Sequence, residues 1–191
     1  MAFAQPKKVY TENELYEYAV AALARRMRPV GELKRMLRRK VEAKTELGET
    51  LVELIIRRLK DQGYLNDSQY AAAYSSFRRD NEKFGRRRVT SDLKSKGVHG
   101  EVAEKAVTAA YEDVDEELQA RLYLRRKRLQ KPANQKEAAR IFRNLMRAGF
   151  SSKIIFTILK RWDVDDETLT ALQGEEEESR KESGRESLNV S

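Results

Sequence analysis

A helix-ending pattern recurs in this sequence and sets the organisation expected of the whole chain. The segments LKSKGV (93–98) and LMRAGF (145–150) share a leucine, two variable positions, a helix-end residue, a glycine and an apolar residue. LRRKVE (37–42) is a weaker copy in which the glycine is missing. Self-similarity at a period of ~50 residues is typical of arrays that repeat one supersecondary unit. We therefore expect tandem modules that pack on one another.

The first period contains signals for three helices. Thr11 and Glu14 have the spacing of a capping box, and apolar residues then recur at helical spacing as far as Met27. Pro29 suits the first turn of a second helix. Gly63 suits the left-handed position that ends a third. The same order is predicted for the two later periods.

In the second period, Asp67 or Ser68 is expected to cap the first helix. The side chains expected on the apolar faces of the later helices are Tyr70, Tyr74, Phe77, Val89, Leu93, Val102, Ala106 and Ala110, and then Leu118, Leu122, Leu129, Ala139, Phe142, Leu145, Met146, Ile155, Ile158, Leu159 and Trp162. The spacing of the aromatic residues among them indicates core packing rather than exposed platforms for base stacking.

These patterns predict an all-α fold. Charged residues make up 37% of the chain, while glycine and proline are few, which disfavours a β fold. We predict an elongated array of three tandem three-helix modules at residues 11–64, 65–112 and 113–164. Residues 174–191 include four consecutive glutamates and few large apolar side chains, so a disordered acidic tail is expected there. A short helix within residues 165–173 is expected to precede it.

Catalytic, cofactor and metal sites are not expected. The chain has no cysteine and one histidine, His99, which lies between two predicted helices and suits a linker or capping role. None of the common phosphate-loop, dinucleotide, hydrolase or zinc-protease motifs occurs. The N-terminal residues lack the apolar run of a signal peptide, and no window approaches the ~18 apolar residues of a membrane span. We expect a cytoplasmic monomer that does not contact membranes.

The basic side chains form three clusters at the same place in each predicted module, from the end of the first helix through the second. The first cluster is Arg25, Arg26, Arg28, Lys34, Arg35, Arg38, Arg39, Lys40 and Lys44. The second is Arg78, Arg79, Lys83, Arg86, Arg87, Arg88, Lys94 and Lys96. The third lies in residues 121–147 and includes Arg125, Arg126, Lys127 and Arg128. With a net charge of +8, these clusters favour an anionic partner, either nucleic acid or an acidic protein surface.

If stacked modules keep a common orientation, the three clusters should form a positive track along one side of the array. One alternative is that they are solvated helix faces whose long side chains cover apolar surface. Another is that GRRRV (85–89) is a nuclear-targeting run, although so short a run within a helix is weak evidence. Recurrence at one structural position favours the track.

Two segments of the second period carry a specific pattern. RLKDQGYLNDSQYAAAY (58–74) has a helix ending in G-Y-L-N-D before a small aromatic helix, and KFGRRRVTSDLKSKGV (83–98) continues it. Together with ALARRMRPVGELKRML (22–37), these segments closely resemble the RecX family of bacterial RecA regulators over about residues 12–162. Two positions depart from the family pattern: Pro29 replaces the usual Ser or Thr, and Val41 replaces a glycine. Both concern loop geometry in the first module.

The resemblance implies a non-enzymatic regulator made of three tandem three-helix modules. Such a protein is expected to bind the RecA nucleoprotein filament in its helical groove and to dampen ATP hydrolysis, strand exchange and filament growth. This would place it in DNA repair, DNA recombination and the SOS response. Direct binding of single- or double-stranded DNA, independent of sequence, also agrees with the resemblance. Two alternatives remain: a DNA-binding helical protein that acts without RecA, and a helical scaffold that grips another protein.

Overall fold

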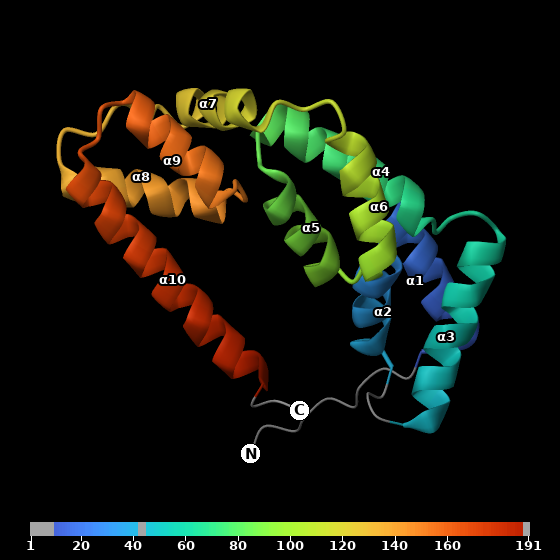
Figure 1. Cartoon of the computed structure of the whole chain (residues 1–191). Helices are drawn as coiled ribbons and strands as arrows, with labels where there is room; N and C mark the ends of the chain where they lie inside the picture. The colour runs from blue at the N-terminus through green and yellow to red at the C-terminus, as the bar shows by residue number, and fades with distance from the viewer. Residues whose placement is uncertain (1–9, 42–44, 189–191) are drawn as a thin grey trace, which may run out of the picture. The chain divides into compact units, whose positions relative to one another are not determined.

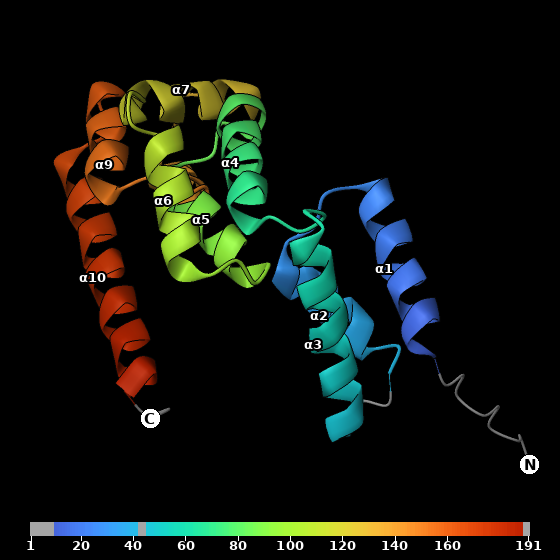
Figure 2. The ribbon, with the colours of Figure 1, turned by 90° about the vertical axis from the view of Figure 1, so that its right-hand side faces the viewer.

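The computed structural model describes residues 10–41 and 45–188, and within these ranges the chain consists of helices and connecting turns, without a strand (Figure 1 and Figure 2). The helices are α1 (Glu12–Arg25), α2 (Val30–Arg38), α3 (Glu46–Asp61), α4 (Asp67–Phe77), the π-helix η1 (Arg78–Glu82), α5 (Arg86–Ser95), α6 (Gly100–Ala110), α7 (Glu116–Arg126), α8 (Gln135–Arg147), α9 (Ser152–Arg161) and α10 (Asp166–Leu188). The predicted all-α class is confirmed. Residues 1–9, on which the signal-peptide prediction rests, and Lys44 of the first basic cluster lie outside the described residues.

The first-period helices begin and end where the sequence predicts. The Thr11 N–H donates to Glu14 Oε2 at 3.0 Å, and the Glu14 N–H donates to Thr11 Oγ1 at 3.3 Å, which completes the capping box of α1. Pro29 precedes α2 and supplies no side-chain acceptor to it. Gly63 has φ 76° and follows the end of α3. The start of α1 and the end of α3 are therefore set by local chemistry.

Both copies of the helix-ending pattern have the same geometry. Gly97 (φ 89°) follows α5, and Gly149 (φ 91°) follows α8. The N–H groups of the next residues, Val98 and Phe150, donate back to the leucine carbonyl that begins each pattern, at 3.1 and 3.2 Å. Both of these side chains are buried. The glycine allows the left-handed turn, and the apolar residue after it enters the core.

The contacts divide the chain into two compact units. One contains the residues up to Ser76 and Thr90–Ala110, and the other contains Phe77–Val89 and the residues from Tyr111 onward. We call them the N-unit and the C-unit. Their division runs through α5 and separates most of α4 from η1, so the helices of the predicted second module are shared between the units. The division into three modules stays a prediction.

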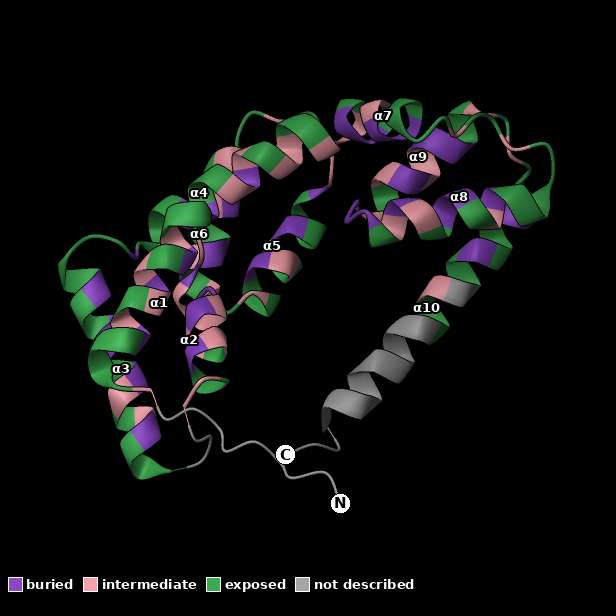
Figure 3. Ribbon diagram, turned by 180° about the vertical axis from the view of Figure 1, so that it is seen from behind, coloured by how far each residue is buried: buried purple, intermediate pink, exposed green. Residues whose placement is uncertain are grey.

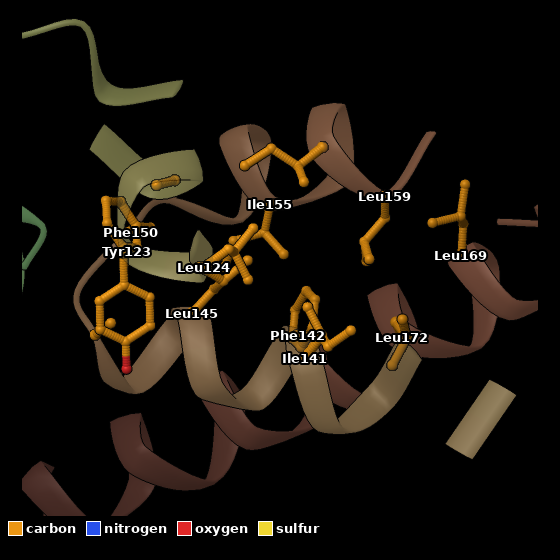
Figure 4. Close-up of a cluster of buried hydrophobic side chains, with 13 residues drawn as sticks. Tyr123, Leu124, Ile141, Phe142, Leu145, Phe150, Ile155, Leu159, Leu169 and Leu172 are labelled. Carbon is orange, nitrogen blue, oxygen red and sulfur yellow. The ribbon is translucent and has the colours of Figure 1, made fainter. Parts of the chain in front are cut away.

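Each unit has its own apolar core. In the N-unit α1, α2 and α3 pack against one another; the buried cluster there is Leu15, Ala19, Ala22, Leu33, Leu37, Val52, Ile55, Ile56, Leu59 and Leu65. In the C-unit α9 packs against α7 and α8, and α10 packs against α8. Figure 4 shows Leu169 and Leu172 of α10 in the same cluster as Phe142 and Leu159. Along these helices buried positions alternate with exposed ones at helical spacing (Figure 3).

The predicted inward faces of α6 and α7 are wrong. In α6 the buried residues are Ala103 and Val107, one position away from the predicted Val102, Ala106 and Ala110, which are half-buried. This helix is rich in alanine, so neighbouring faces differ little in hydrophobicity. In α7 the buried positions are Gln119, Ala120, Tyr123 and Leu124. Leu118, predicted to point inward, is 55% exposed, and so is Phe77 at the end of α4.

The connection between α4 and α5 contains a π-helical turn that the sequence analysis did not predict. Lys83 follows η1 in the left-handed conformation, with φ 57°, and the Phe84 N–H donates to the Arg78 carbonyl at 3.2 Å. The Gln119 amide of α7 donates to the Arg79 carbonyl at 2.7 Å. Such a turn depends on contacts from distant segments, which the local pattern does not contain.

The acidic C-terminal segment continues the last helix as far as Leu188, and its predicted disorder stays a prediction. The structure has one helix, α10, from Asp166 to Leu188, where the sequence predicted a short helix and then a disordered tail from residue 174. Asp165 caps this helix, since its Oδ1 accepts the Thr168 N–H at 2.7 Å. That hydrogen bond lowers the pKa of the Asp165 carboxyl. The many glutamates, with high helix propensity, favour continuation of the capped and anchored first turns.

Candidate nucleic-acid and protein interface

The first basic cluster begins where α1 ends. Arg26 Nη2 lies 2.5 Å from Glu32 Oε1, and Arg28 forms an ion pair with the same carboxylate. Because one carboxylate serves two guanidinium groups, this corner keeps a net positive charge. Arg25 and Arg39 are exposed, and neither has a hydrogen-bond or ion-pair partner for its side chain within the described residues.

Two further cations of this cluster join α2 to α3. Lys34 Nζ lies 2.6 Å from Glu53 Oε1, and Arg38 Nη2 lies 2.8 Å from Glu49 Oε2. The hydrogen bond with Glu49 raises the pKa of Arg38 above its usual value. Because these groups are in contact with solvent, the pairs orient side chains and add little stability.

The second basic cluster is divided between the units. In the C-unit the Arg79 guanidinium donates two hydrogen bonds to Asp80, at 2.7 and 2.9 Å, which lower the pKa of that carboxyl. Arg78 and Arg88 lie over the ring of Phe84, with their guanidinium carbons 4.6 and 5.9 Å from its centroid. These cation–π contacts place two positive charges at the turn before α5.

The first turn of α5 carries the three consecutive arginines. Arg86, Arg87 and Arg88 are all exposed, and the Arg87 side chain has no hydrogen-bond or ion-pair partner within the described part of the chain. At the other end of α5, in the N-unit, Lys94 Nζ lies 2.8 Å from Glu104 Oε1 of α6. The positive charge of α5 is therefore concentrated at its start.

The third basic cluster lies at the end of α7. Four consecutive members of it are all exposed: Arg125, Arg126, Lys127 and Arg128. Arg126 Nη1 lies 2.7 Å from Glu82 Oε2, which ties this cluster to η1 within the C-unit. Arg128 has φ 55° and ends α7 in the conformation that glycine adopts after α5 and α8. Arg125 has no side-chain partner among the described residues.

A close backbone contact joins the start of α2 to the end of α5, and we call it the first glycine junction. It is formed by Gly31, in the first turn of α2, and Gly97. A Cβ atom at Gly31 would lie 2.6 Å from the Gly97 Cα, and one at Gly97 would lie 2.8 Å from the Gly31 Cα. Arg35, one turn further along α2, donates to the Lys96 carbonyl at 3.0 Å. Only glycine permits this approach at both positions.

Asp67 supports the first glycine junction from α4. Its Oδ1 accepts the N–H of Val30, the first residue of α2, at 2.8 Å. Asp67 thus supplies the acceptor that Pro29 lacks. The predicted cap of α4 is corrected accordingly: Asn66, rather than Asp67 or Ser68, accepts the N–H of the third helical residue at 2.9 Å.

The second glycine junction joins the start of α5 to the end of α8. Gly85 precedes α5, and a Cβ atom there would lie 2.3 Å from the Gly149 carbonyl oxygen. A Cβ atom at Gly149 would lie 2.3 Å from the backbone nitrogen of Arg88. The Gly85 N–H also donates to the Ala148 carbonyl at 2.8 Å, which bonds the two helix ends directly. The backbones therefore touch as they do at the first glycine junction.

Both junctions connect the start of one period's second helix to the end of the next period's second helix. The cations of the first two clusters lie on or beside helices that these junctions hold. The sequence pattern predicts Gly97 and Gly149 as helix ends but does not predict their partners, Gly31 and Gly85. Both partners lie near the start of a second helix, Gly31 in the first turn of α2 and Gly85 directly before α5, but they are not at matching positions of the repeat.

Other kinds of site find no support in the described residues. No group of three or more His, Cys, Asp or Glu side chains is arranged there to hold a metal ion. His99 is exposed just before α6, and its carbonyl accepts the Ala103 N–H at 3.0 Å, in agreement with a position at a helix start. No described helix combines the length and apolarity needed to cross a membrane.

Comparison with known proteins identifies relatives of this arrangement. The family model described as "RecX, second three-helix domain" matches residues 66–107. The regulatory protein RecX of Myxococcus xanthus is 34% identical over 162 residues, which cover 77% of this chain and 84% of that protein. The chain belongs to the RecX family. The family prediction made from the sequence is therefore confirmed.

Two further RecX proteins extend the comparison. The regulatory protein RecX of Oceanobacillus iheyensis is 30% identical over 175 residues, which cover 86% of this chain. The matched region spans 61% of that relative's length. The crystal structure of RecX from Lactobacillus salivarius matches with a TM-score of 0.58 at 24% identity and covers 80% of this chain and 96% of that one. This last likeness concerns the fold, which is the helical RecX fold.

Proposed function

We propose that this protein regulates the RecA recombinase by binding the RecA–DNA filament, where it dampens ATP hydrolysis, strand exchange and filament growth. The observation that carries the proposal is membership of the RecX family, whose curated members named above are regulatory proteins. The cationic clusters supply the chemistry for contact with acidic protein surface or DNA phosphate. In this proposal the protein acts as a cytoplasmic monomer.

The three clusters would act together. We also propose residues 11–64, 65–112 and 113–164 as the repeating modules, and the family-model match to residues 66–107 supports the middle one. Each module then contributes a weak contact, and covalent connection gives the later contacts a high effective concentration. The glycine junctions support this mechanism because each one, within its own unit, holds a helix that carries part of a basic cluster.

Measurement of RecA's DNA-dependent ATPase tests the proposal. Wild-type protein should lower the ATPase rate, and the variant Arg86→Ala/Arg87→Ala/Arg88→Ala should need a several-fold higher concentration for the same effect. Circular dichroism of the variant checks that its helices are retained. An ATPase rate that stays constant as wild-type protein is added would contradict RecA regulation.

A second function, DNA binding independent of RecA, is favoured by the exposed arginines of α5 and the positive net charge. It predicts that the logarithm of DNA affinity falls linearly with the logarithm of salt concentration, with a slope of about −0.9 per phosphate contacted on duplex DNA. Loss of DNA binding in the triple-arginine variant, with no effect of wild-type protein on RecA, would support this alternative. A protein scaffold for a third partner predicts neither result.

A further inference from the structure

A half-open pocket of about 180 Å³ lies in the N-unit between α1 and the turn that joins α3 to α4. Its apolar wall comes from Val20, Leu23 and Ala24 of α1. Met27 and Tyr64 stand at the pocket with 49% and 56% of their surface exposed. An exposed aromatic ring beside an apolar hollow is a feature of ligand-binding sites.

The backbone around Tyr64 is already fixed. The Tyr64 N–H donates to the Leu59 carbonyl at 2.9 Å, and the Gly63 N–H donates to the Lys60 carbonyl at 2.9 Å, so the end of α3 closes in a hydrogen-bonded turn. Two bonds hold the Arg28 side chain, which lines the pocket: its Nε donates to the Ala22 carbonyl at 3.2 Å, and its Nη1 to the carboxylate of α2 described above. A preformed pocket loses little entropy when it binds a ligand.

The polar groups at this pocket suit a flat heterocycle with hydrogen-bonding edges. The Tyr64 hydroxyl and the side-chain amides of Asn66 and Gln69 come from lining residues. An aromatic face can stack with any nucleobase, and amides can donate to or accept from its edge. The volume of the pocket is of the order of one such ring system.

The charge beside the pocket indicates which kind of polymer would carry such a ring. Arg25 and Arg26 directly precede Met27, and both are exposed. Arg25 has no side-chain partner within the described residues, and the single Glu32 carboxylate is shared by Arg26 and Arg28. The surplus positive charge matches a phosphodiester strand better than an uncharged protein segment.

From this juxtaposition we propose that the pocket binds one unpaired base of a single-stranded nucleic acid, which stacks on Tyr64 while Arg25 and Arg26 contact the neighbouring phosphates. The proposal deepens the proposed function, because a RecA filament contains single-stranded DNA, but its test does not need RecA. The bases of duplex DNA are already stacked and would not enter. The site therefore distinguishes unpaired from paired DNA.

Fluorescence anisotropy with two labelled oligonucleotides tests the proposal. One is a twelve-nucleotide thymidine strand, and the other is an abasic strand with the same phosphates. Base stacking on an aromatic side chain is worth about 1–3 kcal/mol, so Tyr64→Ala should weaken binding of the thymidine strand by about 5- to 150-fold. Its affinity for the abasic strand should not change. Tyr64→Phe keeps the ring and should retain most of the affinity.

The matched control is Phe77→Ala, which removes an aromatic side chain of equal exposure from the C-unit. It should leave both affinities unchanged. Equal binding of the thymidine strand by wild type and Tyr64→Ala would overturn the proposal, as would equal losses on both strands or no measurable binding by wild type at low salt.

RecA ATPase measured on the same variants separates the pocket from the proposed function. If Tyr64→Ala loses inhibition of RecA while its binding to the thymidine strand is unchanged, the pocket takes a protein side chain and the base proposal is overturned. If wild type leaves the RecA ATPase rate unchanged while Tyr64→Ala selectively loses binding of the thymidine strand, the base-binding proposal is supported and RecA regulation is contradicted.

Discussion

The first and second glycine junctions share a backbone contact but differ in what supports it. At the first, side chains contribute: Arg35 donates to the Lys96 carbonyl at 3.0 Å, and Asp67 accepts the N–H of the first residue of α2 at 2.8 Å. At the second, the support is largely backbone: the Gly85 N–H donates to the Ala148 carbonyl at 2.8 Å. The two junctions therefore share a close glycine contact and differ in the groups around it. Substitutions at the first junction should therefore lower the free energy of unfolding by graded amounts. A substitution at the second junction should lower it strongly.

The second junction should show the largest effect of a single substitution. Gly85→Ala places a methyl group 2.3 Å from the Gly149 carbonyl oxygen, which is backbone and cannot turn aside. We expect the free energy of unfolding to fall by about 3 kcal/mol or more, because overpacking of this kind forces backbone shifts. Trp162, the single tryptophan, packs on the C-unit core and reports the loss as an earlier urea transition by fluorescence.

Gly63→Ala is the reference for a glycine substitution that meets no close contact. Gly63 has φ 76°, close to that of Gly97 and Gly149, yet no atom lies within 4 Å of a Cβ placed there. Only left-handed strain remains, so we expect a loss of about 1 kcal/mol. If Gly85→Ala costs no more than Gly63→Ala, the close approach at the second junction does not restrict the chain.

The first junction should be disrupted by Gly31→Ala, but less severely. The new methyl group would lie 2.6 Å from the Gly97 Cα, and we expect a loss of about 2 kcal/mol in the free energy of unfolding. Because this junction lies in the N-unit, circular dichroism should shift further than Trp162 fluorescence. Equal shifts of the two signals would contradict a separate role for the first junction.

Removal of Asp67 tests the side-chain support of the first junction. Asp67→Ala leaves the Val30 N–H without its acceptor, and loss of a helix cap costs about 1 kcal/mol. Asp67→Asn keeps an acceptor oxygen, so its free energy of unfolding should fall by only a few tenths of that amount. Urea unfolding followed by circular dichroism measures both, and equal destabilisation by the two variants would mean that the carboxylate acts through its charge instead.

Arg35→Ala should have the smallest effect on stability. It removes the hydrogen bond to the Lys96 carbonyl at a solvent-exposed site, and we expect a loss of about 0.5–1 kcal/mol. Arg39→Ala is the control, because it removes an equal charge from the end of the same helix without a side-chain partner among the described residues. Thermal unfolding that is equal for the two variants would assign the effect to charge alone.

Much of the helical fold could be predicted because its signals are local. The capping box of Thr11 and Glu14, the left-handed Gly63 and the two glycine-ended leucine patterns depend on neighbouring residues only. In α6, by contrast, Ala103 and Ala106 are chemically identical, and only packing decides that Ala103 is the buried one. The sequence pattern there predicts a helix but not its inward face.

The candidate site was predicted in part for the same reason. The basic clusters can be recognised in the sequence. Which of their side chains form ion pairs, however, depends on acidic residues far along the chain. Arg38 meets Glu49 and Arg126 meets Glu82, and neither pairing follows from helical spacing. The pocket at Tyr64 combines α1 with the α3–α4 turn and has no local pattern at all.

The most direct test of the basic surface compares two triple variants in the RecA ATPase assay. The first, Arg39→Ala/Arg87→Ala/Arg125→Ala, removes one cation from each cluster. The second, Arg57→Ala/Lys105→Ala/Lys153→Ala, removes the same charge from exposed residues outside the clusters. None of these six side chains has a hydrogen-bond or ion-pair partner within the described residues, so both folds should be retained. We predict that the first variant needs at least about tenfold more protein for half-maximal inhibition, through lost multivalent contacts, while the second behaves as wild type. Equal inhibition by the two variants would contradict a binding surface made by the three clusters.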